Sequence, residues 1–384
     1  MFRLVIVGGR LQGVEAAYLG LKAGMHVTVI DQDPKAPARG LCHQFHCLDV
    51  CRPNQALRNI LTAAQGVLPA LENPAVLEML KELTRTWHLK TVFDWQAFDL
   101  TTSKRKSTEL FRECHIPVPR AYPAGKAPYI AKPVSESGSR GVRLLAEAHE
   151  AGAFLRSAAD PDQWMVEEYL EGKAYSMEVV GVPGNYRTYA LTEIIVDEGY
   201  DCCQVLAPCP LVPRGAVCQL SDHAITLAEK LALRGIMDVE VIETRGTMNV
   251  LEIDARIPSQ TPTVVYHSTG VNLLSELVQV CLTDEFATRP WEETTGQNKW
   301  VSYEHLVVTG DALVCQGEHV MSDRGPLYHQ YGFFGADEAL TNYREGVHDW
   351  AATLINTADT QEGLVAKRAA MMEKIRGLQK GMKA

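Results

Sequence analysis

The sequence lacks a hydrophobic run long enough to cross a membrane or to form a secretory core. Its 384 residues open on Phe2-Arg3-Leu4-Val5-Ile6-Val7, which predicts a short buried strand closed by Gly8-Gly9. We therefore expect a cytoplasmic protein that no membrane holds. The ten cysteines are scattered over the chain, so we expect reduced thiols rather than a disulfide framework.

Positive charge is also scarce. The chain has 37 Lys and Arg against 47 Asp and Glu, a net charge of -10, which argues against nucleic acid as the main partner because phosphate backbones require a basic surface. A small anion such as a nucleotide can still bind through local Lys, Arg and backbone N–H groups. The chain has neither internal repeats nor low-complexity tracts, and its length suffices for two or three units with their own cores. The stretch from Gln361 predicts a basic amphipathic helix, which we interpret as a solvated surface helix.

The order of strand and helix patterns predicts an α/β amino-terminal unit followed by α+β units. A strand at 3–7, a helix near 13–23 and a strand at 27–30 form a βαβ opening, which indicates a parallel sheet. Further along the chain the patterns predict a strand at 91–94, helices at 103–114, 146–157 and 221–234, a strand near 301–308 and helices from about 336. We divide the chain at 1–100, 101–175 and 176–384.

The first strand ends in a glycine-rich turn. Gly8, Gly9 and Gly13 let it turn sharply into a helix whose N-terminus can face an anion. Their spacing misses the dinucleotide-binding fingerprint, although Asp31 stands where a ribose-binding acid would lie. A nicotinamide-dependent oxidoreductase and a purely structural turn, in which glycine permits close helix–strand packing, both stay open here.

Residues 42–51 contain five potential zinc ligands among ten residues. A structural zinc site normally uses two well-separated pairs of ligands. We interpret the Cys42–Cys51 segment as a surface loop with incidental thiols, and its role is left open.

Two lysines precede small-residue or extended segments. Lys104 opens a helix that leads to Ile116-Pro117-Val118-Pro119, and Lys132 lies on a short apolar strand. The loop after Lys132, which contains Ser135, Ser137 and Gly138, could fold over phosphates with its N–H groups. Alternatively, Lys132 is a surface lysine on an edge strand.

The segment 238–256 reads DVEVIETRGTMNVLEIDAR and alternates with period two on both sides of Gly246. Antiparallel pairing about Gly246 places Glu240 opposite Glu252 and Asp238 opposite Asp254, on one face with Arg256. Val239, Val241, Leu251 and Ile253 are predicted to fill the core face. Opposed like charges destabilise a sheet, so this face predicts bound cations, and oxygen ligands favour magnesium. A solvated acidic face without a site is the alternative.

Taken in order, these segments resemble the ATP-grasp superfamily over about residues 1–290. The motifs are the lysine before I-P-x-P, A-K-P with its loop, E-E-Y-L at 167–170, and E…E-x-D-x-R ending at Arg256. The resemblance implies an ATP-grasp fold behind a Rossmann-like domain, and an amide bond made through an acyl phosphate. It implies ATP phosphates on Lys104, Lys132, Ser135, Ser137 and Gly138, adenine at Glu168, Tyr169 and Leu170, two Mg²⁺ ions on Glu240, Glu252 and Asp254, and catalytic roles for Lys132 and Arg256. Asp254 replaces the usual Asn, and Ala174 stands where the family's ribose-binding Glu is expected.

Segments 8–18 and 251–270 are similar to the methylornithine–lysine ligase family of pyrrolysine biosynthesis. This resemblance implies the substrates methyl-D-ornithine and L-lysine, and nothing in the spacing does. The candidate substrate contacts are Leu11, Gln12, Ser176, Glu178, Arg256, Ser259 and His267. A ligase for another amino-acid pair and a non-catalytic nucleotide sensor stay open, as do an ordinary structural role for His267 and a homodimer.

Overall fold

The amino-terminal unit is a four-stranded parallel sheet. The computed structural model describes residues 1–135, 138–139, 141–289, 298–310 and 312–381. The sheet order is β3-β2-β1-β4, and every neighbouring pair is parallel, so the predicted βαβ opening is confirmed. Its elements are β1 (Arg3–Val7), α1 (Leu11–Lys22), β2 (His26–Asp31), η1 (Pro37–Leu41), β3 (Gln44–Cys47), α2 (Gln55–Ala63), β4 (Gly66–Pro69) and α3 (Pro74–Trp87).

The strand predicted at 91–94 is wrong. Thr91 forms one isolated parallel bridge with Val67 on β4. The chain then turns, because the Asp94 carboxylate accepts hydrogen bonds from the N–H groups of Gln96 and Ala97 and caps helix α4 (Trp95–Thr101).

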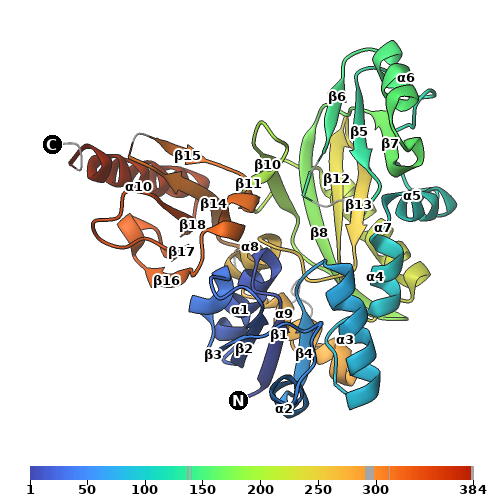
Figure 1. Cartoon of the computed structure of the whole chain (residues 1–384). Helices are drawn as coiled ribbons and strands as arrows, with labels where there is room; N and C mark the ends of the chain where they lie inside the picture. Colours follow the sequence, from blue (N-terminus) through green and yellow to red (C-terminus); the bar gives the residue numbers. More distant parts are fainter. Residues whose placement is uncertain (136–137, 140, 290–297, 311, 382–384) are drawn as a thin grey trace.

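A small lobe built on three antiparallel strands follows, at the upper right of Figure 1. Its order is β6-β5-β7, and Tyr129, Ala131, Ala151 and Val166 form its core. The helices predicted at 103–114 and 146–157 are confirmed. The elements are α5 (Lys104–Glu113), β5 (Tyr129–Pro133), β6 (Arg143–Leu145), α6 (Ala148–Ser157), η2 (Pro161–Gln163) and β7 (Trp164–Glu168).

The rest of the chain is organised on an eleven-stranded sheet of order β13-β12-β8-β10-β11-β14-β18-β17-β16, with β9 beside β8 and β15 beside β14. This sheet spans Figure 1 from the small lobe to the carboxyl-terminal helix. Its strands are β8 (Lys173–Val182), β9 (Asn185–Thr188), β10 (Thr192–Val196), β11 (Cys202–Ala207), β12 (Gly235–Thr244), β13 (Thr247–Asp254), β14 (Trp300–Val308), β15 (Leu313–Cys315), β16 (Tyr328–Tyr331), β17 (Glu338–Thr341) and β18 (Trp350–Ala358). The helices are α7 (Arg214–Leu231), α8 (Thr261–Thr269), α9 (Leu273–Thr283), η4 (Glu318–Asp323), η5 (Phe333–Gly335) and α10 (Gln361–Gly381).

Two predictions in this region need correction. Helices were expected from about 336, but β17 and β18 are strands there, because β18 pairs with β14 along its whole length and buries Trp350 and Ile355. Helix α7 begins at Arg214 rather than near 221, directly after Pro213. The predicted strand near 301–308 and the helix from Gln361 are confirmed. The division of the chain at residues 100 and 175 stays a prediction.

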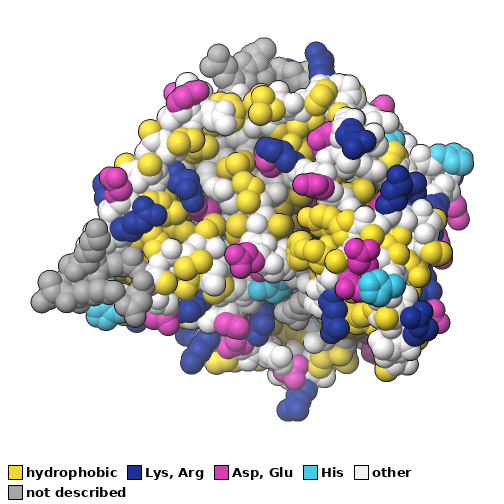
Figure 2. Space-filling view, turned by 90° about the horizontal axis from the view of Figure 1, so that it is seen from above, with side chains coloured by type: hydrophobic (Ala, Val, Ile, Leu, Met, Phe, Trp, Pro, Cys, Tyr) yellow, Lys and Arg dark blue, Asp and Glu magenta, His cyan; other side chains and the backbone are white. Residues whose placement is uncertain are grey.

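The outer surface mixes charges of both signs. On the face seen from above, Lys and Arg side chains are dispersed among Asp and Glu side chains (Figure 2). Among the helices within the described part of the chain, none combines the length and apolarity that a bilayer crossing demands.

Candidate active site

The acidic hairpin forms as predicted at the end that carries its four carboxylates. Glu240 lies opposite Glu252, and Asp238 lies opposite Asp254. Arg245 and Gly246 make the turn, both with positive φ, at 54° and 84°. This is the backbone that two-residue hairpin turns require.

Leu251 is where the predicted alternation fails. The pairing register shifts between Glu240 and Val241, so Val241 pairs with Val250 and Leu251 is the extra residue of a β-bulge. Val250 is therefore buried in the core, whereas Leu251 is half-buried and lines a pocket on the acidic side. The prediction that Leu251 fills the core is wrong.

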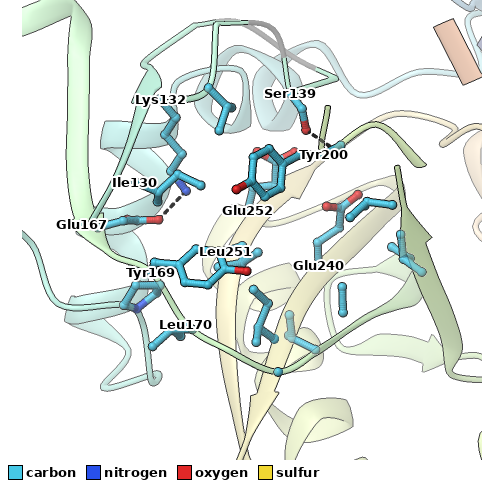
Figure 3. A pocket seen from close by; sticks show the side chains of 18 of the residues that line it. Ile130, Lys132, Ser139, Glu167, Tyr169, Leu170, Tyr200, Glu240, Leu251 and Glu252 are labelled. Atoms are coloured by element: carbon cyan, nitrogen blue, oxygen red, sulfur yellow. Dashed lines mark hydrogen bonds and ion pairs between the residues drawn. The ribbon is translucent and has the colours of Figure 1, made fainter. Parts of the chain in front are cut away.

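That pocket lies between the small lobe and the hairpin (Figure 3). Strands β5 and β7 supply one wall with Ile130, Lys132 and Glu167, and the segment after β7 supplies Tyr169 and Leu170. The hairpin supplies the opposite wall. The hairpin residues that line the pocket include Glu240, Leu251 and Glu252, and Lys104 of α5 lines it as well. The structure thus brings both predicted phosphate lysines and two predicted metal carboxylates to one cavity.

Lys132 has a buried partner that the sequence did not reveal. Its Nζ lies 2.6 Å from Glu167 Oε1, with both side chains at least nine-tenths buried. Ile130 is directly opposite Glu167 in the β5–β7 ladder, and residues two apart on a strand share a face. Alternation along β7 puts Glu167 on the face opposite the core residue Val166, and only the strand pairing identifies its partner.

Among the described residues, the segment after β7 has a backbone N–H group without a backbone acceptor at the edge of this pocket, that of Leu170. The N–H groups of Glu168 and Tyr169 donate to the carbonyls of Arg120 and Pro128, and within the described chain the Leu170 N–H has no such acceptor. The Glu168 carboxylate points toward the neighbouring turn, where it accepts from the N–H and Nε of Arg120 at 3.0 and 3.2 Å. Although burial opposes ionisation, these hydrogen bonds hold the Glu168 pKa below its usual value.

The carboxylates of the hairpin have divergent proton affinities. Burial first, then Glu252 and Asp254, raise the pKa of Glu240 to about 8. Burial also raises the pKa of Asp254 to about 6 despite Arg256. Burial opposes ionisation of Glu252 too, but Lys104 lies 2.5 Å from its Oε2 and lowers the Glu252 pKa. Such a set favours a further cation near Glu240.

Arg256 links the hairpin to the amino-terminal unit. Its Nη2 lies 3.1 Å from Asp254 Oδ2 and 2.7 Å from Oε1 of Glu72, in the loop after β4. Glu72 also borders a second recess that is lined by Lys104, Ser135, Glu252 and Asp254. No sequence motif points to Glu72, because it belongs to a loop that is distant along the chain.

The carboxylate oxygens on the acidic face of the hairpin are suitable ligands for magnesium bound together with phosphate. No group of three His, Cys, Asp or Glu side chains within the described residues is arranged to hold a metal ion. Glu240 and Glu252 nevertheless face each other, and magnesium commonly uses one or two carboxylates plus phosphate oxygens.

Comparisons with known proteins agree with this geometry. Residues 101–260 match the ATP-grasp domain family. The chain is 38% identical over 339 residues to the 3-methyl-D-ornithine–L-lysine ligase of Methanosarcina barkeri, covering 86% of this chain and 88% of that protein. The enzyme of the same name from Methanosarcina acetivorans is 37% identical, with the same coverage of both chains. The chain belongs to the 3-methyl-D-ornithine–L-lysine ligase family.

A solved structure shows the same fold at low identity. It is the biotin carboxylase domain of 2-oxoglutarate carboxylase from Hydrogenobacter thermophilus, in complex with MgADP and bicarbonate. The TM-score is 0.72 at 15% identity, covering 97% of this chain and 90% of that one. The predicted ATP-grasp fold with a Rossmann-like amino-terminal unit is thereby confirmed for this member of the ligase family.

The residues predicted to contact substrates in this ligase do not all lie together. Ser176 pairs with Glu240, and Glu178 with Asp238, across strands β8 and β12. Both β8 side chains are buried, and burial raises the Glu178 pKa to about 7. His267 lies in a different group, where its Nε2 is 2.7 Å from the Tyr18 hydroxyl and 3.9 Å from Glu338.

The remaining predicted residues have varied surroundings. The side chain of Ser259 interacts with the half-buried Glu318. Leu11 packs on the core at the start of α1. Gln12 donates to Glu72 at 2.8 Å. Ser135 is exposed and borders the second recess. A side chain at Gly138 would collide with the His319 ring, and Ser137 lies outside the described residues.

The glycines of the turn after β1 allow the start of α1 to pack closely against the end of the strand. A Cβ at Gly13 would collide with the Gly8 carbonyl. The Asp31 carboxylate accepts from the N–H groups of Gly9 and Asp33 at 2.7 and 2.8 Å. Asp31 thus stabilises the turn, and family membership displaces the oxidoreductase alternative. The thiols of Cys42, Cys47 and Cys51 are free.

Proposed function

We propose that this ligase joins the carboxylate of 3-methyl-D-ornithine to the side-chain amine of L-lysine in pyrrolysine biosynthesis, at the cost of ATP. One observation carries the chemistry: Lys132 and Lys104 meet Glu240 and Glu252 across a single pocket. Positive groups for a triphosphate and oxygen ligands for its cation are thereby in one place. The substrate pair rests on the enzymes that share more than a third of their residues with this chain.

ATP binds with its base toward the segment after β7 and its phosphates toward the lysines. The N–H of Leu170, which has no backbone acceptor within the described chain, donates a hydrogen bond to the adenine edge. The side chains of Ile130, Tyr169 and Leu251 enclose the ring. Lys132, held by Glu167, and Lys104, held by Glu252, face the phosphates. Ser135 and Gly138 contribute N–H groups to the phosphates.

Glu240 and Glu252 hold magnesium, with Asp254 beside them, and two ions fit the number of carboxylates. When bound, the metal neutralises negative charge on the phosphates. With an ion bound there, Glu252 would contact the ion, and Lys104, which now pairs with Glu252, would be left to bind a phosphate oxygen. A bound cation would keep Glu240 ionised, because it would oppose the burial that raises the pKa of this carboxyl to about 8.

The residues of this chain then position two successive displacements. The methylornithine carboxylate oxygen attacks the γ-phosphorus, ADP leaves, and an acyl phosphate forms. The ε-amine of lysine, which must first lose a proton because its usual pKa is about 10.4, attacks the acyl carbon and displaces phosphate. Arg256, next to Asp254, stabilises the charge that develops on the transferred group.

The test is ADP release by the purified protein with ATP, magnesium, L-lysine and 3-methyl-D-ornithine, with the product weighed by mass spectrometry. We expect ADP release that depends on both amino acids, and a product of their summed mass less one water. Turnover only with other amino-acid pairs would contradict the substrate assignment. ATP binding without ADP release for any pair would favour a nucleotide sensor.

Two further proposals accompany this function. A biosynthetic role on free amino acids is consistent with a cytoplasmic location. A homodimer is also proposed, and sedimentation of the purified chain measures it.

A further inference from the structure

Three apolar side chains form one row across the large sheet, on the floor of the pocket between the small lobe and the hairpin. Ala174 of β8 pairs with Ile194 of β10 and with Ile242 of β12, and all three are half-buried residues that line the pocket. Glu240 lies two residues before Ile242 on β12, and Leu170 lies three residues before β8 begins. This apolar row therefore lies between the segment after β7 and the Glu240 carboxylate, which Figure 3 shows on different sides of the pocket.

The position of the apolar row is that of the sugar of a bound nucleotide. The ribose joins the base to the phosphates, and the proposed function places adenine at Leu170 and the phosphates toward Lys132 and Glu240. Side chains two residues apart on one face of a strand are separated by about 7 Å, so the ribose lies over the row next to that of Glu240. The inference thus rests on the proposed function.

The apolar row offers no side-chain group to the hydroxyls of a ribose. Proteins that read these hydroxyls commonly use a carboxylate, but Glu168, at the adenine end, accepts hydrogen bonds from the N–H and Nε of Arg120. The neighbours of the row along its strands project from the opposite face of the sheet. Among them, Tyr175 is 4% exposed in the core, and Glu193 pairs with Lys173 at 2.6 Å.

One hydroxyl group remains beside the row among the described lining residues. Tyr200 lies in the turn that continues from β10, and it lines the pocket next to Ser139 (Figure 3). The Ser139 hydroxyl donates to the Tyr200 carbonyl at 2.7 Å, so its hydrogen is engaged. The Tyr200 ring can cover the sugar by apolar contact, and a Phe variant separates that contact from a hydrogen bond of its hydroxyl.

We propose that this pocket recognises the base and the phosphates of its nucleotide but not the hydroxyls of its sugar, so that the ligase uses 2′-deoxyATP as readily as ATP. Ala174, Ile194 and Ile242 determine this specificity, because they contact the sugar by apolar packing alone. With 2′-deoxyATP, a carboxylate oxygen of the substrate bonds to the γ-phosphorus, the bond from that phosphorus to the β–γ bridging oxygen breaks, and 2′-deoxyADP leaves. The sugar takes no part in these steps, so they balance as with ATP.

The test compares ADP, 2′-deoxyADP and 2′,3′-dideoxyADP, whose binding with magnesium is measured by calorimetry. The proteins are the wild type, Tyr200→Phe, Ala174→Glu and Ala174→Leu. Ala174→Glu places a carboxylate in the apolar row, and Ala174→Leu is its control for added bulk without a hydrogen-bonding group. Ligation rates with ATP and 2′-deoxyATP provide the second readout.

We expect the wild type and Tyr200→Phe to bind all three nucleotides within about 3-fold of one another, because an apolar surface discriminates weakly against a missing hydroxyl. Ala174→Glu should prefer ADP by about 10- to 100-fold, since its carboxylate accepts from the sugar hydroxyls. Ala174→Leu should weaken all three nucleotides alike.

A wild-type preference for ADP of about 10-fold or more would overturn the inference, and its loss in Tyr200→Phe would assign the preference to the Tyr200 hydroxyl. Equal binding of the three nucleotides to Ala174→Glu would overturn it as well, because the sugar would then lie elsewhere. A wild type that binds none of them contradicts the proposed nucleotide site and the inference together. Nucleotide binding without ligation contradicts only the proposed function, so the two failures are distinguished.

Discussion

Lys132 on β5 and Glu167 on β7 form a buried ion pair of 2.6 Å on the wall of the pocket between the small lobe and the hairpin. Removing one partner of such a pair leaves a buried charge uncompensated, which usually costs several kcal/mol. We predict that Glu167→Gln destabilises the protein by about 3 kcal/mol and weakens ATP binding, because Lys132 loses its orientation.

The double variant Lys132→Met, Glu167→Leu separates stability from function. Apolar replacements of both partners should restore most of the stability, since no charge stays buried, while ATP affinity stays low. Urea denaturation and ATP titration measure the two quantities. Normal ATP affinity in the double variant would show that Lys132 does not hold the nucleotide.

Glu252 tests the metal role. We predict that Glu252→Gln lowers ligation by at least about 100-fold, because an amide is a weaker magnesium ligand and no longer balances Lys104. The circular dichroism spectrum should be unchanged. Glu198→Gln, an exposed site, is the matched control and should retain wild-type rates. Full activity in Glu252→Gln would refute the metal assignment.

The β-bulge at Leu251 yields a pair of contrasting variants. Val250 is 1% exposed in the core, so Val250→Ala should cost about 1–3 kcal/mol of unfolding free energy. Leu251 lines the pocket between the small lobe and the hairpin instead, so Leu251→Ala should cost less than about 1 kcal/mol and, if ATP binds there as proposed, raise the KM for ATP. The reverse pattern would mean that Leu251, not Val250, faces the core.

The raised pKa of the buried Glu15 carboxyl predicts how the free energy of unfolding depends on pH. Glu15 is 1% exposed and accepts from the Thr263 N–H at 2.6 Å. Burial, opposed by these hydrogen bonds, raises its pKa from 4.5 to about 8. Between these two values the folded protein keeps a proton that the unfolded chain releases, so this group makes stability fall as pH rises through that window.

The neutral isostere Glu15→Gln should remove that dependence. We expect it to be more stable than the wild type at pH 9, by about 1–3 kcal/mol, and similar to it near pH 5. Thermal unfolding across this range measures the difference. A wild type and variant with parallel pH profiles would contradict the assignment to Glu15.

Local alternation was enough to predict the hairpin, because Asp238, Glu240, Glu252 and Asp254 keep a strict period of two about a glycine turn. It could not predict the bulge at Leu251, since a single extra residue changes the pairing without changing the composition. The strands after residue 336 were missed for a related reason: β18 is stabilised by its ladder with β14, far away in the sequence.

Residues of the candidate site could be predicted where they belong to sequence motifs, but not where only the folding of the chain brings them to the pocket. Lys104, Lys132 and Leu170 lie in recognisable segments, and the pocket brings them together. Glu167 and Glu72 carry no motif, and only the pairing of strands and the packing of the amino-terminal unit place them. His267 is both a candidate substrate contact and a candidate structural histidine from the sequence; it contacts Tyr18 and Glu338, two residues that are distant from it along the chain.

The central claim is that a carboxylate oxygen of the substrate becomes bonded to the γ-phosphorus. Ligation with 3-methyl-D-ornithine labelled with ¹⁸O in both carboxylate oxygens measures this directly, with the released phosphate examined by mass spectrometry. The account predicts one ¹⁸O atom in each phosphate formed. Phosphate free of ¹⁸O, formed at the same rate as the ligated product, would contradict it.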